Sequence, residues 1–208
     1  MSPTREERKE AITKQRKQQI LDAALATFSK KGFAEATTAE IARTAGIAEG
    51  TIYKYFPSKR ELMVAVIKTF ALTEPLLSLF DHAGETDFPA FFTAVLENRM
   101  NLIEGSKKGE PLLLMGELLR DPELKEIFNR QVIRPIITTM EKFYGSGVTA
   151  GYFRPLDTTI ITQAMGGLVI GLLILNLLEG ESSPLKGIPR QKLATEIVEL
   201  VLKGIQRD

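Results

Sequence analysis

The stretch TTAEIARTAGIAEGTIYKYFPSK, residues 37–59, restricts this chain to folds that hold two short helices at a tight turn. Thr37 and Glu40 have the spacing of a capping box, in which a hydroxyl and a carboxylate satisfy the first amides of a helix. Gly46 stands where a helix ends in a left-handed residue. A second helix is predicted over about residues 48–55. This spacing is typical of a helix-turn-helix.

The outward face of the predicted second helix carries groups suited to DNA. Gly50 would permit close backbone approach, Thr51 and Tyr53 offer hydroxyls, and Lys54 offers a positive charge. Phosphates are bound by such groups and by helix N-termini, and a helix fits the major groove. The candidate positions on and just beyond this helix are Glu49, Gly50, Thr51, Tyr53, Lys54, Tyr55 and Lys59. The same pattern also fits a solvated face on an ordinary three-helix packing, because helix-turn-helix pairs occur without DNA.

A predicted helix ending in FSKKGF, followed by TTAEIARTAGIAEGTIYKYFPSKREL, resembles the TetR family of bacterial transcriptional repressors over about residues 20–62. The resemblance implies that one group of residues faces base edges: Glu49, Gly50 and Thr51. It implies that a second group holds phosphates: Thr38, Tyr53, Tyr55 and Lys59. Lys54 stands where the family is variable. A repressor released from operator DNA by a small ligand is implied by the resemblance alone.

The composition argues against an enzyme. The chain has no cysteine and one histidine, His82, and no P-loop or nucleophile motif is present. One histidine without companions does not make a metal site. We therefore expect no catalytic residue, no metal and no cofactor. The lack of cysteine and of an apolar N-terminal signal fits a cytoplasmic protein.

Charge is distributed unevenly along the chain. Residues 1–62 hold 12 Lys and Arg against 8 Asp and Glu, whereas residues 63–208 hold 15 against 18. A basic front and an acidic rear suit a nucleic-acid-binding part joined to a part with another task.

We predict an all-α protein of about nine helices in two domains. Residues 1–57 would form the helix-turn-helix DNA-binding domain, and residues 58–208 a helical regulatory and dimerisation domain. Residues 1–16 are charged and poor in apolar side chains, which favours a flexible arm that either reaches a DNA groove or stays solvated. The remaining helices are expected over about residues 17–32, 58–80, 88–106, 110–120, 122–150, 158–178 and 190–206.

Two features interrupt the helix expected over residues 122–150. Pro135 lacks an amide proton and should kink it. The GSG sequence at residues 145–147 favours a break on local grounds, but the resemblance implies that the helix continues to Ala150, and we adopt that prediction.

Aromatic and methionine side chains in the second domain are candidates for a ligand pocket, although such residues at helical spacing also form plain core. Few ionisable groups lie among them, which favours a small apolar ligand, lipid-like or aromatic. These candidates are Phe92, Met100, Met115, Phe128, Tyr144 and Tyr152.

The run AMGGLVIGLLILNLL, residues 164–178, is the most apolar segment. It is shorter than the roughly 20 residues that cross a bilayer, and it is apolar on all faces, so we expect a helix buried all round. The alternative is a membrane-associated or partner-interaction protein. One recognition helix reaches few base pairs, so a twofold homodimer is expected, with the last two helices forming a four-helix bundle. The predicted interface residues are Ala164, Gly167, Gly171, Leu193, Ile197, Leu200 and Val201.

Overall fold

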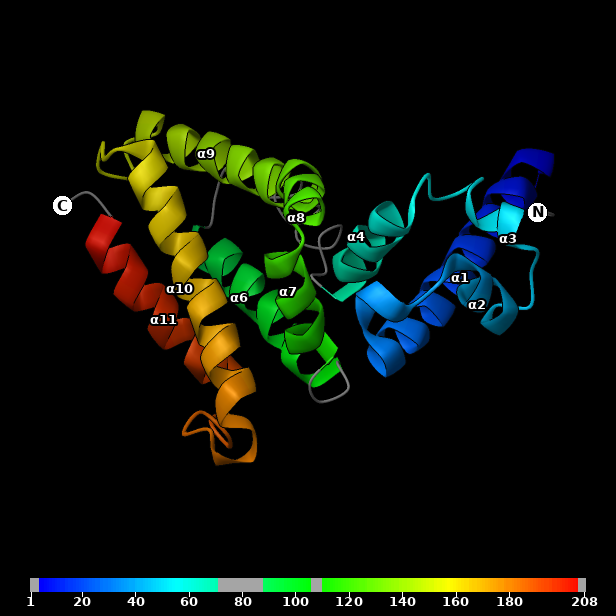
Figure 1. Ribbon diagram of the computed structural model, residues 1–208. Helices are drawn as coiled ribbons and strands as arrows, with labels where there is room; N and C mark the ends of the chain where they lie inside the picture. Colours follow the sequence, from blue (N-terminus) through cyan, green and yellow to red (C-terminus); the bar gives the residue numbers. More distant parts are fainter. Residues whose placement is uncertain (1–3, 71–87, 106–109, 206–208) are drawn as a thin grey trace. The chain divides into compact units, whose positions relative to one another are not determined.

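A computed structural model describes residues 4–70, 88–105 and 110–205 of the chain. Its elements are helices (Figure 1), which confirms the predicted all-α class. The α-helices are α1 Arg5–Glu35, α2 Thr38–Thr44, α3 Glu49–Ile52, α4 Lys59–Phe70, α6 Phe88–Gly105, α7 Glu110–Arg120, α8 Pro122–Phe128, α9 Arg134–Thr149, α10 Thr158–Glu179 and α11 Arg190–Ile205. A π-helical segment, Asn129–Ile133, precedes α9, and a short 3₁₀ segment, Gly180–Ser182, follows α10.

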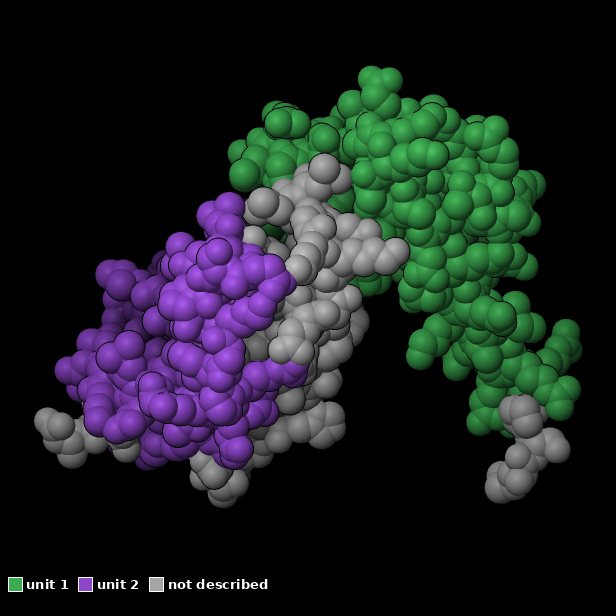
Figure 2. Space-filling view, turned by 90° about the horizontal axis from the view of Figure 1, so that it is seen from below, with its two compact units in different colours: residues 1–69, 113–128 green, residues 70–112, 129–208 purple. Residues whose placement is uncertain are grey.

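The contacts divide the chain into two compact units, coloured separately in Figure 2. Unit 1 comprises residues 1–69 and 113–128, and unit 2 comprises residues 70–112 and 129–208. The unit that holds the helix-turn-helix therefore extends beyond the domain boundary predicted after residue 57, and it includes α8 and most of α7.

The core of unit 1 is built on the apolar stripe of α1. Ile20, Ala24 and Phe28 of that stripe are fully buried, and burial of a side chain such as Phe28 contributes about 1.5–3 kcal/mol. The helical path breaks at Gly32, whose φ is +79°, as the sequence predicted. Phe33 then packs back onto Phe28 with ring centroids 5.6 Å apart.

The predicted flexibility of residues 1–16 is wrong for most of them, because α1 begins at Arg5. The Thr4 amide donates to Glu7 Oε2 at 2.6 Å, and the Glu7 amide donates to Thr4 Oγ1 at 3.2 Å. This capping box starts a helix of Glu, Lys, Arg and Gln residues, which have high helix propensity. The charge of these residues had favoured a flexible arm, but the cap at Thr4 and Glu7 starts a helix instead. Exposed side chains predominate over this segment.

Two expectations fall on residues outside the described part of the chain. These are the continuation of α4 to about residue 80, and the loop at residues 81–87 that contains His82.

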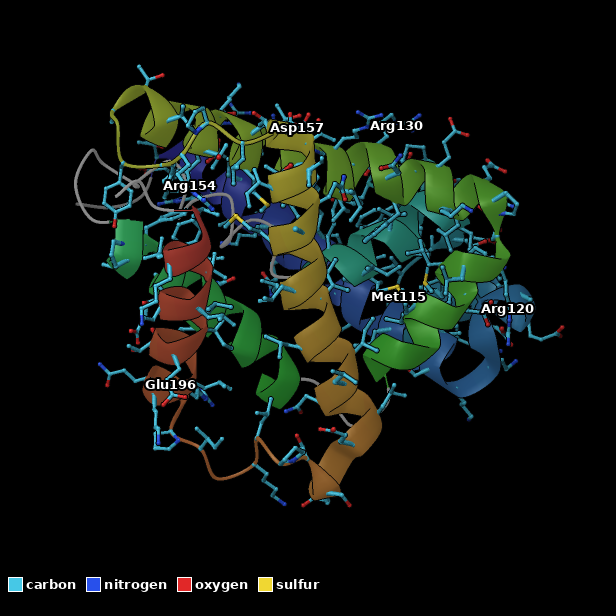
Figure 3. The ribbon with its side chains drawn as sticks, turned by 90° about the vertical axis from the view of Figure 1, so that its left-hand side faces the viewer. Met115, Arg120, Arg130, Arg154, Asp157 and Glu196 are labelled. Carbon is cyan, nitrogen blue, oxygen red and sulfur yellow. The ribbon has the colours of Figure 1, made fainter. Side chains whose placement is uncertain are left out.

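Unit 2 is a packing of α6, α9, α10 and α11, in which α11 lies against α6, and α10 lies against α6 and α9. Its buried core contains Leu96, Tyr144, Phe153, Ala194, Val198, Leu202 and Ile205. The predicted turn between α9 and α10 is present, and Asp157 caps α10 by accepting a hydrogen bond from the Ile160 amide at 3.0 Å. Figure 3 shows Asp157 at the start of α10 and Arg154 beside the C-terminal end of α11. There the Arg154 amide donates to the Ile205 carbonyl at 2.8 Å.

The segment from α8 to α9 contains both features that were expected to interrupt a helix, Pro135 and the GSG sequence. The predicted disturbance at Pro135 takes the form of the π-helical segment Asn129–Ile133, since Pro135 has no amide to donate to the preceding turn. The helix then continues through the GSG sequence to Thr149, as the resemblance implied. Gly147 has a packing role in this helix, because a Cβ there would lie 2.2 Å from Cδ2 of Phe153.

The expectation that α10 is buried all round is wrong for the single chain. Ile160 and Leu178 are 70% and 64% exposed, and Ile170 and Leu175 are also exposed. Within the described residues, the stretch Thr158–Asn176 is long and apolar enough to cross a membrane by length and composition alone. Only 6% of that stretch is buried inside the chain. The part of the chain that the structure describes therefore leaves much of the apolar surface of α10 uncovered.

Candidate nucleic-acid interface and ligand cavity

The capping box predicted for the first helix of the pair is present at α2. The Glu40 amide donates to Thr37 Oγ1 at 3.2 Å, and the Thr37 amide donates to Glu40 Oε2 at 3.2 Å. Lys31 also donates to Glu40, and these bonds lower the pKa of the Glu40 carboxyl, with the Lys31 hydrogen bond first and the Thr37 amide second. The start of α2 is thereby fixed to α1. Gly46 follows α2 with a φ of +65°, as predicted.

The second helix of the pair is shorter than predicted. Helix α3 comprises four residues, and residues 53–55 continue it as a tight turn. The amides of Tyr55 and Phe56 both donate to the Ile52 carbonyl at 2.9 Å. Ile52 itself is fully buried. Because Ile52 anchors α3 in the core, the polar side chains of this short helix face outward.

Three predicted DNA contacts come together at the junction of α2 and α3. The Thr38 hydroxyl donates to Glu49 Oε1 at 2.5 Å, and it lies 3.0 Å from the Tyr53 hydroxyl. Tyr53 remains 49% exposed. The beginning of α2 and the outward face of α3 thus form one continuous polar surface, which we call the α2–α3 face.

The other predicted positions on the α2–α3 face are also accessible. Gly50 and Lys54 are exposed, and Thr51 and Tyr55 are half-buried. A Cβ placed on Gly50 would meet no heavy atom of the described residues within 4 Å. Packing inside the chain therefore does not require glycine there, whereas close approach of a partner to the backbone would.

Lys59 does not belong to the α2–α3 face. Its ammonium donates to the carbonyl oxygens of Phe33, Ala34 and Ala36 at 2.8, 3.3 and 2.9 Å. An ammonium group has three donors, and all three are used inside the protein. In this conformation the ammonium of Lys59 is directed to carbonyls of its own chain and not to the α2–α3 face.

Unit 2 contains a partly open cavity of about 260 Å³ between α6, α9, α10 and α11. Of the predicted ligand residues, Phe92 and Tyr144 line it, whereas Tyr152 packs against the adjacent core. Met115 (Figure 3) and Phe128 belong to unit 1. The Met100 side chain lies outside the described side chains.

Most residues that line the cavity were not among the predicted ligand residues, although the sequence of α9 contains a signal for them. The cavity-facing residues at helical spacing along this segment are Ile133, Ile136, Ile137, Met140, Phe143 and Tyr144. Such a stripe marks one helix face. Choosing aromatic and methionine residues alone overlooked the isoleucines.

The lining of the cavity is almost entirely apolar. Among the described residues that line it, polar side chains come from Tyr144, Thr162 and Gln163. The Thr162 hydroxyl donates to the Thr158 carbonyl at 2.8 Å, and the Tyr144 hydroxyl donates to the Arg154 carbonyl at 2.5 Å. Both hydroxyls are therefore already engaged. The cavity suits an apolar ligand or the apolar part of a larger one.

The helix-turn-helix and the whole chain both resemble known regulators. Residues 20–66 match the bacterial regulatory proteins of the tetR family. The chain is 22% identical over 194 residues to the fatty acid metabolism regulator protein of Bacillus subtilis, a match that covers 90% of this chain and 94% of that protein. It is 44% identical over 54 residues to the HTH-type transcriptional repressor KstR of Rhodococcus jostii, 26% of each chain.

A solved structure agrees with these matches. The transcriptional regulator FadR from Bacillus subtilis, in complex with stearoyl-CoA, superposes with a TM-score of 0.70 at 20% identity, over 90% of this chain and 98% of that one. These proteins are transcriptional regulators and not enzymes. Residues 20–66 therefore carry the DNA-binding segment of the tetR family of bacterial regulatory proteins, and the chain as a whole is similar to transcriptional regulators.

Proposed function

We propose that this DNA-binding regulator is a cytoplasmic repressor that binds operator DNA as a homodimer and is released by a long-chain acyl-CoA. The observation that carries the ligand proposal is the apolar cavity of unit 2. The name of the Bacillus subtilis relative and the stearoyl-CoA bound to FadR support the choice of an acyl group.

The α2–α3 face is the proposed DNA contact. Glu49, Gly50 and Thr51 would face base edges, where the groups that read sequence must lie. The Tyr53 hydroxyl and its Thr38 neighbour would hold a phosphate, together with Lys54 and Tyr55 at the end of the face. Their exposure and the hydrogen bonds between the two helices support this assignment.

A second copy of the chain is the proposed cover for α10. Ala164 and Gly167 are exposed on this helix. A Cβ placed on Gly167 or Gly171 would meet no heavy atom within 4 Å in the part of the chain that the structure describes. These small residues are therefore not explained by packing inside the chain, whereas a neighbouring backbone in close approach would explain them.

The proposed partner surface on α11 is narrower than the predicted one. Leu200 is 69% exposed, which suits an interface. Leu193, Ile197 and Val201 are half-buried, and the last two also line the cavity. The dimer face of α11 would therefore be centred on Leu200.

The membrane-associated alternative has the exposed apolar stretch of α10 in its favour. Similarity to regulators over nine-tenths of the chain favours the twofold copy instead. Fractionation of cells that make the protein decides between them. The dimer proposal predicts recovery in the soluble fraction, whereas recovery with membranes would contradict it.

Stearoyl-CoA should weaken binding to operator DNA at least about tenfold, which corresponds to about 1.4 kcal/mol. The probe is a duplex that the wild-type protein selects from a random pool, titrated by fluorescence anisotropy with and without the thioester. A ligand changes DNA affinity only through different affinities for the two conformations of the protein. Unchanged DNA affinity at saturating stearoyl-CoA would rule out this ligand class.

Two tryptophan variants on α9 separate cavity binding from surface effects. Ile137→Trp places bulk in the cavity lining, whereas Thr138→Trp places it on the exposed side of the same helix. The first should bind DNA but lose the response to stearoyl-CoA. The second should behave as wild type.

A further inference from the structure

The ammonium of Lys59 caps the C-terminal end of α1, which is far from it in sequence. Its three carbonyl partners belong to Phe33, Ala34 and Ala36, at least 23 residues earlier. The ammonium also lies 4.5 Å from the centroid of the Phe33 ring, within the range of a cation–π interaction. One side chain at the start of α4 therefore makes four contacts with the end of α1.

The geometry of α1 explains why these carbonyls need a donor. The last carbonyls of a helix have no partner within it, and the break at Gly32 turns those of the following residues away from the helical ladder. A cation is favourable at a helix C-terminus, yet the last turn of α1 contains no basic residue. Lys59 provides the missing charge and the missing donors together.

The surroundings of Lys59 partly withdraw it from solvent. Burial is the main cause that lowers its pKa, and the neighbouring Arg60 charge acts in the same direction. Three carboxylates oppose this shift, from Glu35 on α1 and from Glu117 and Asp121 at the end of α7. Lys59 is therefore a half-buried junction between elements of unit 1.

This junction adjoins the DNA-binding surface. Ala36 immediately precedes the N-cap residue Thr37, and Thr38 joins α2 to Glu49 and Tyr53. Arg60, next to Lys59, donates through Nε to Asp121 at 2.9 Å and holds α4 to the start of α8. A shift of the α1 carbonyls would therefore move the start of α2 relative to the rest of unit 1.

We propose that Lys59 is a positioning residue for DNA binding, which holds the end of α1 and hence the start of α2 in place, and does not itself contact a phosphate. This inference rests on the proposed α2–α3 DNA contact. It predicts that loss of the Lys59 donors weakens DNA binding without reducing the number of phosphate contacts.

Lys59→Met tests the proposal, because it keeps an apolar stem near Phe33 and removes the donors. Binding to the selected duplex is measured over a series of salt concentrations, well below the unfolding midpoint recorded by circular dichroism. We expect an affinity loss of about tenfold at every salt concentration, with the wild-type slope of log affinity against log salt. Lys54→Met is the matched control, because loss of one phosphate contact should reduce that slope by about 0.9.

Lys59→Gln provides the rescue and a second variant if Lys59→Met does not fold. Its neutral amide still donates hydrogen bonds, so it should bind DNA more tightly than Lys59→Met and keep the wild-type slope. A slope reduced as in Lys54→Met would overturn the proposal and make Lys59 a phosphate contact. Wild-type affinity together with a lower unfolding midpoint would overturn it in favour of a purely structural role. If the wild-type protein selects no duplex, the proposed function itself fails.

Discussion

Gly171→Leu should convert the protein from a dimer into a monomer at micromolar concentration. The chain has room for a Cβ at Gly171, which would meet no heavy atom within 4 Å among the described residues. A twofold partner packed on this stripe would leave no such room. Overpacking costs about 1–3 kcal/mol per site, and twofold symmetry makes the cost arise twice. The dimer dissociation constant should therefore rise roughly 30-fold or more, at about 1.4 kcal/mol per tenfold change.

Sedimentation equilibrium and DNA titration on the same sample measure this effect. Affinity for the selected duplex should fall together with dimerisation, because only a dimer places two α2–α3 faces on one site. Gly145→Leu on α9 is the matched control, since a Cβ there also meets no heavy atom within 4 Å in the described ranges. It makes the same change within a helix but lies outside the proposed interface. A Gly171→Leu protein that stays dimeric with wild-type affinity would place Gly171 outside the interface.

Phe153→Ala should cost about 3–5 kcal/mol of unfolding free energy, the range for large aromatic truncations in a core. Phe153 is 1% exposed. Its ring stacks on Tyr144 with centroids 5.4 Å apart and lies against Phe92 at 6.2 Å. Removing it would open a void in the centre of unit 2, beside the residues that form the cavity. Urea unfolding followed by circular dichroism gives the free energy.

Gly147→Ala supplies an independent check on the same contact. In the wild-type background its Cβ would lie 2.2 Å from the Phe153 ring, so it should destabilise by about 1–3 kcal/mol. In the Phe153→Ala background that penalty should disappear. Additive costs in the double variant would show that the ring does not rest on Gly147, because interacting sites deviate from additivity by about 0.5–3 kcal/mol.

The helix-turn-helix could be predicted from sequence because its signals are local. The capping box at Thr37 and Glu40 acts over three residues, and the left-handed Gly46 is dictated by the turn itself. The bounds predicted for α7 also followed from local signals. The capping box at Thr4 and Glu7 was an equally local signal. It was missed because the charged composition was given more weight than the three-residue spacing of Thr4 and Glu7.

Features that depend on distant residues could not be predicted in this way. The hydrogen-bond partners of Lys59 lie at the end of α1. The sequence near residue 59 gives no indication of them. Gly147 suggested a break in the helix. The structure shows another reason for glycine there, because the Phe153 ring, six residues later, packs onto the helix at this position. The cavity requires four helices to meet, so a choice by residue type selected Met115 and Phe128, which belong to unit 1.

The exposure of α10 could not be predicted for the same reason, because it depends on residues distant in sequence. An apolar segment without polar faces must be covered, and we expected that cover both from the chain itself and from the twofold copy of the last two helices. The structure leaves Ile160 and Leu178 uncovered, and the Gly167 and Gly171 stripe is unexplained by the described residues of one chain. Composition indicates that burial is needed, but only the packing shows that the described residues of one chain do not provide it.

Selection of duplexes from a random DNA pool is the most direct test of a dimer that reads DNA through its α2–α3 face. The wild-type protein should enrich two inverted copies of a short motif, with centres about 34–36 Å apart or at a multiple of that spacing. Thr51→Ala should alter the preferred base at one symmetric position, whereas Tyr53→Phe should weaken binding and leave the preference unchanged. Failure to enrich any sequence, or enrichment of a single unpaired motif, would contradict DNA recognition by a twofold dimer.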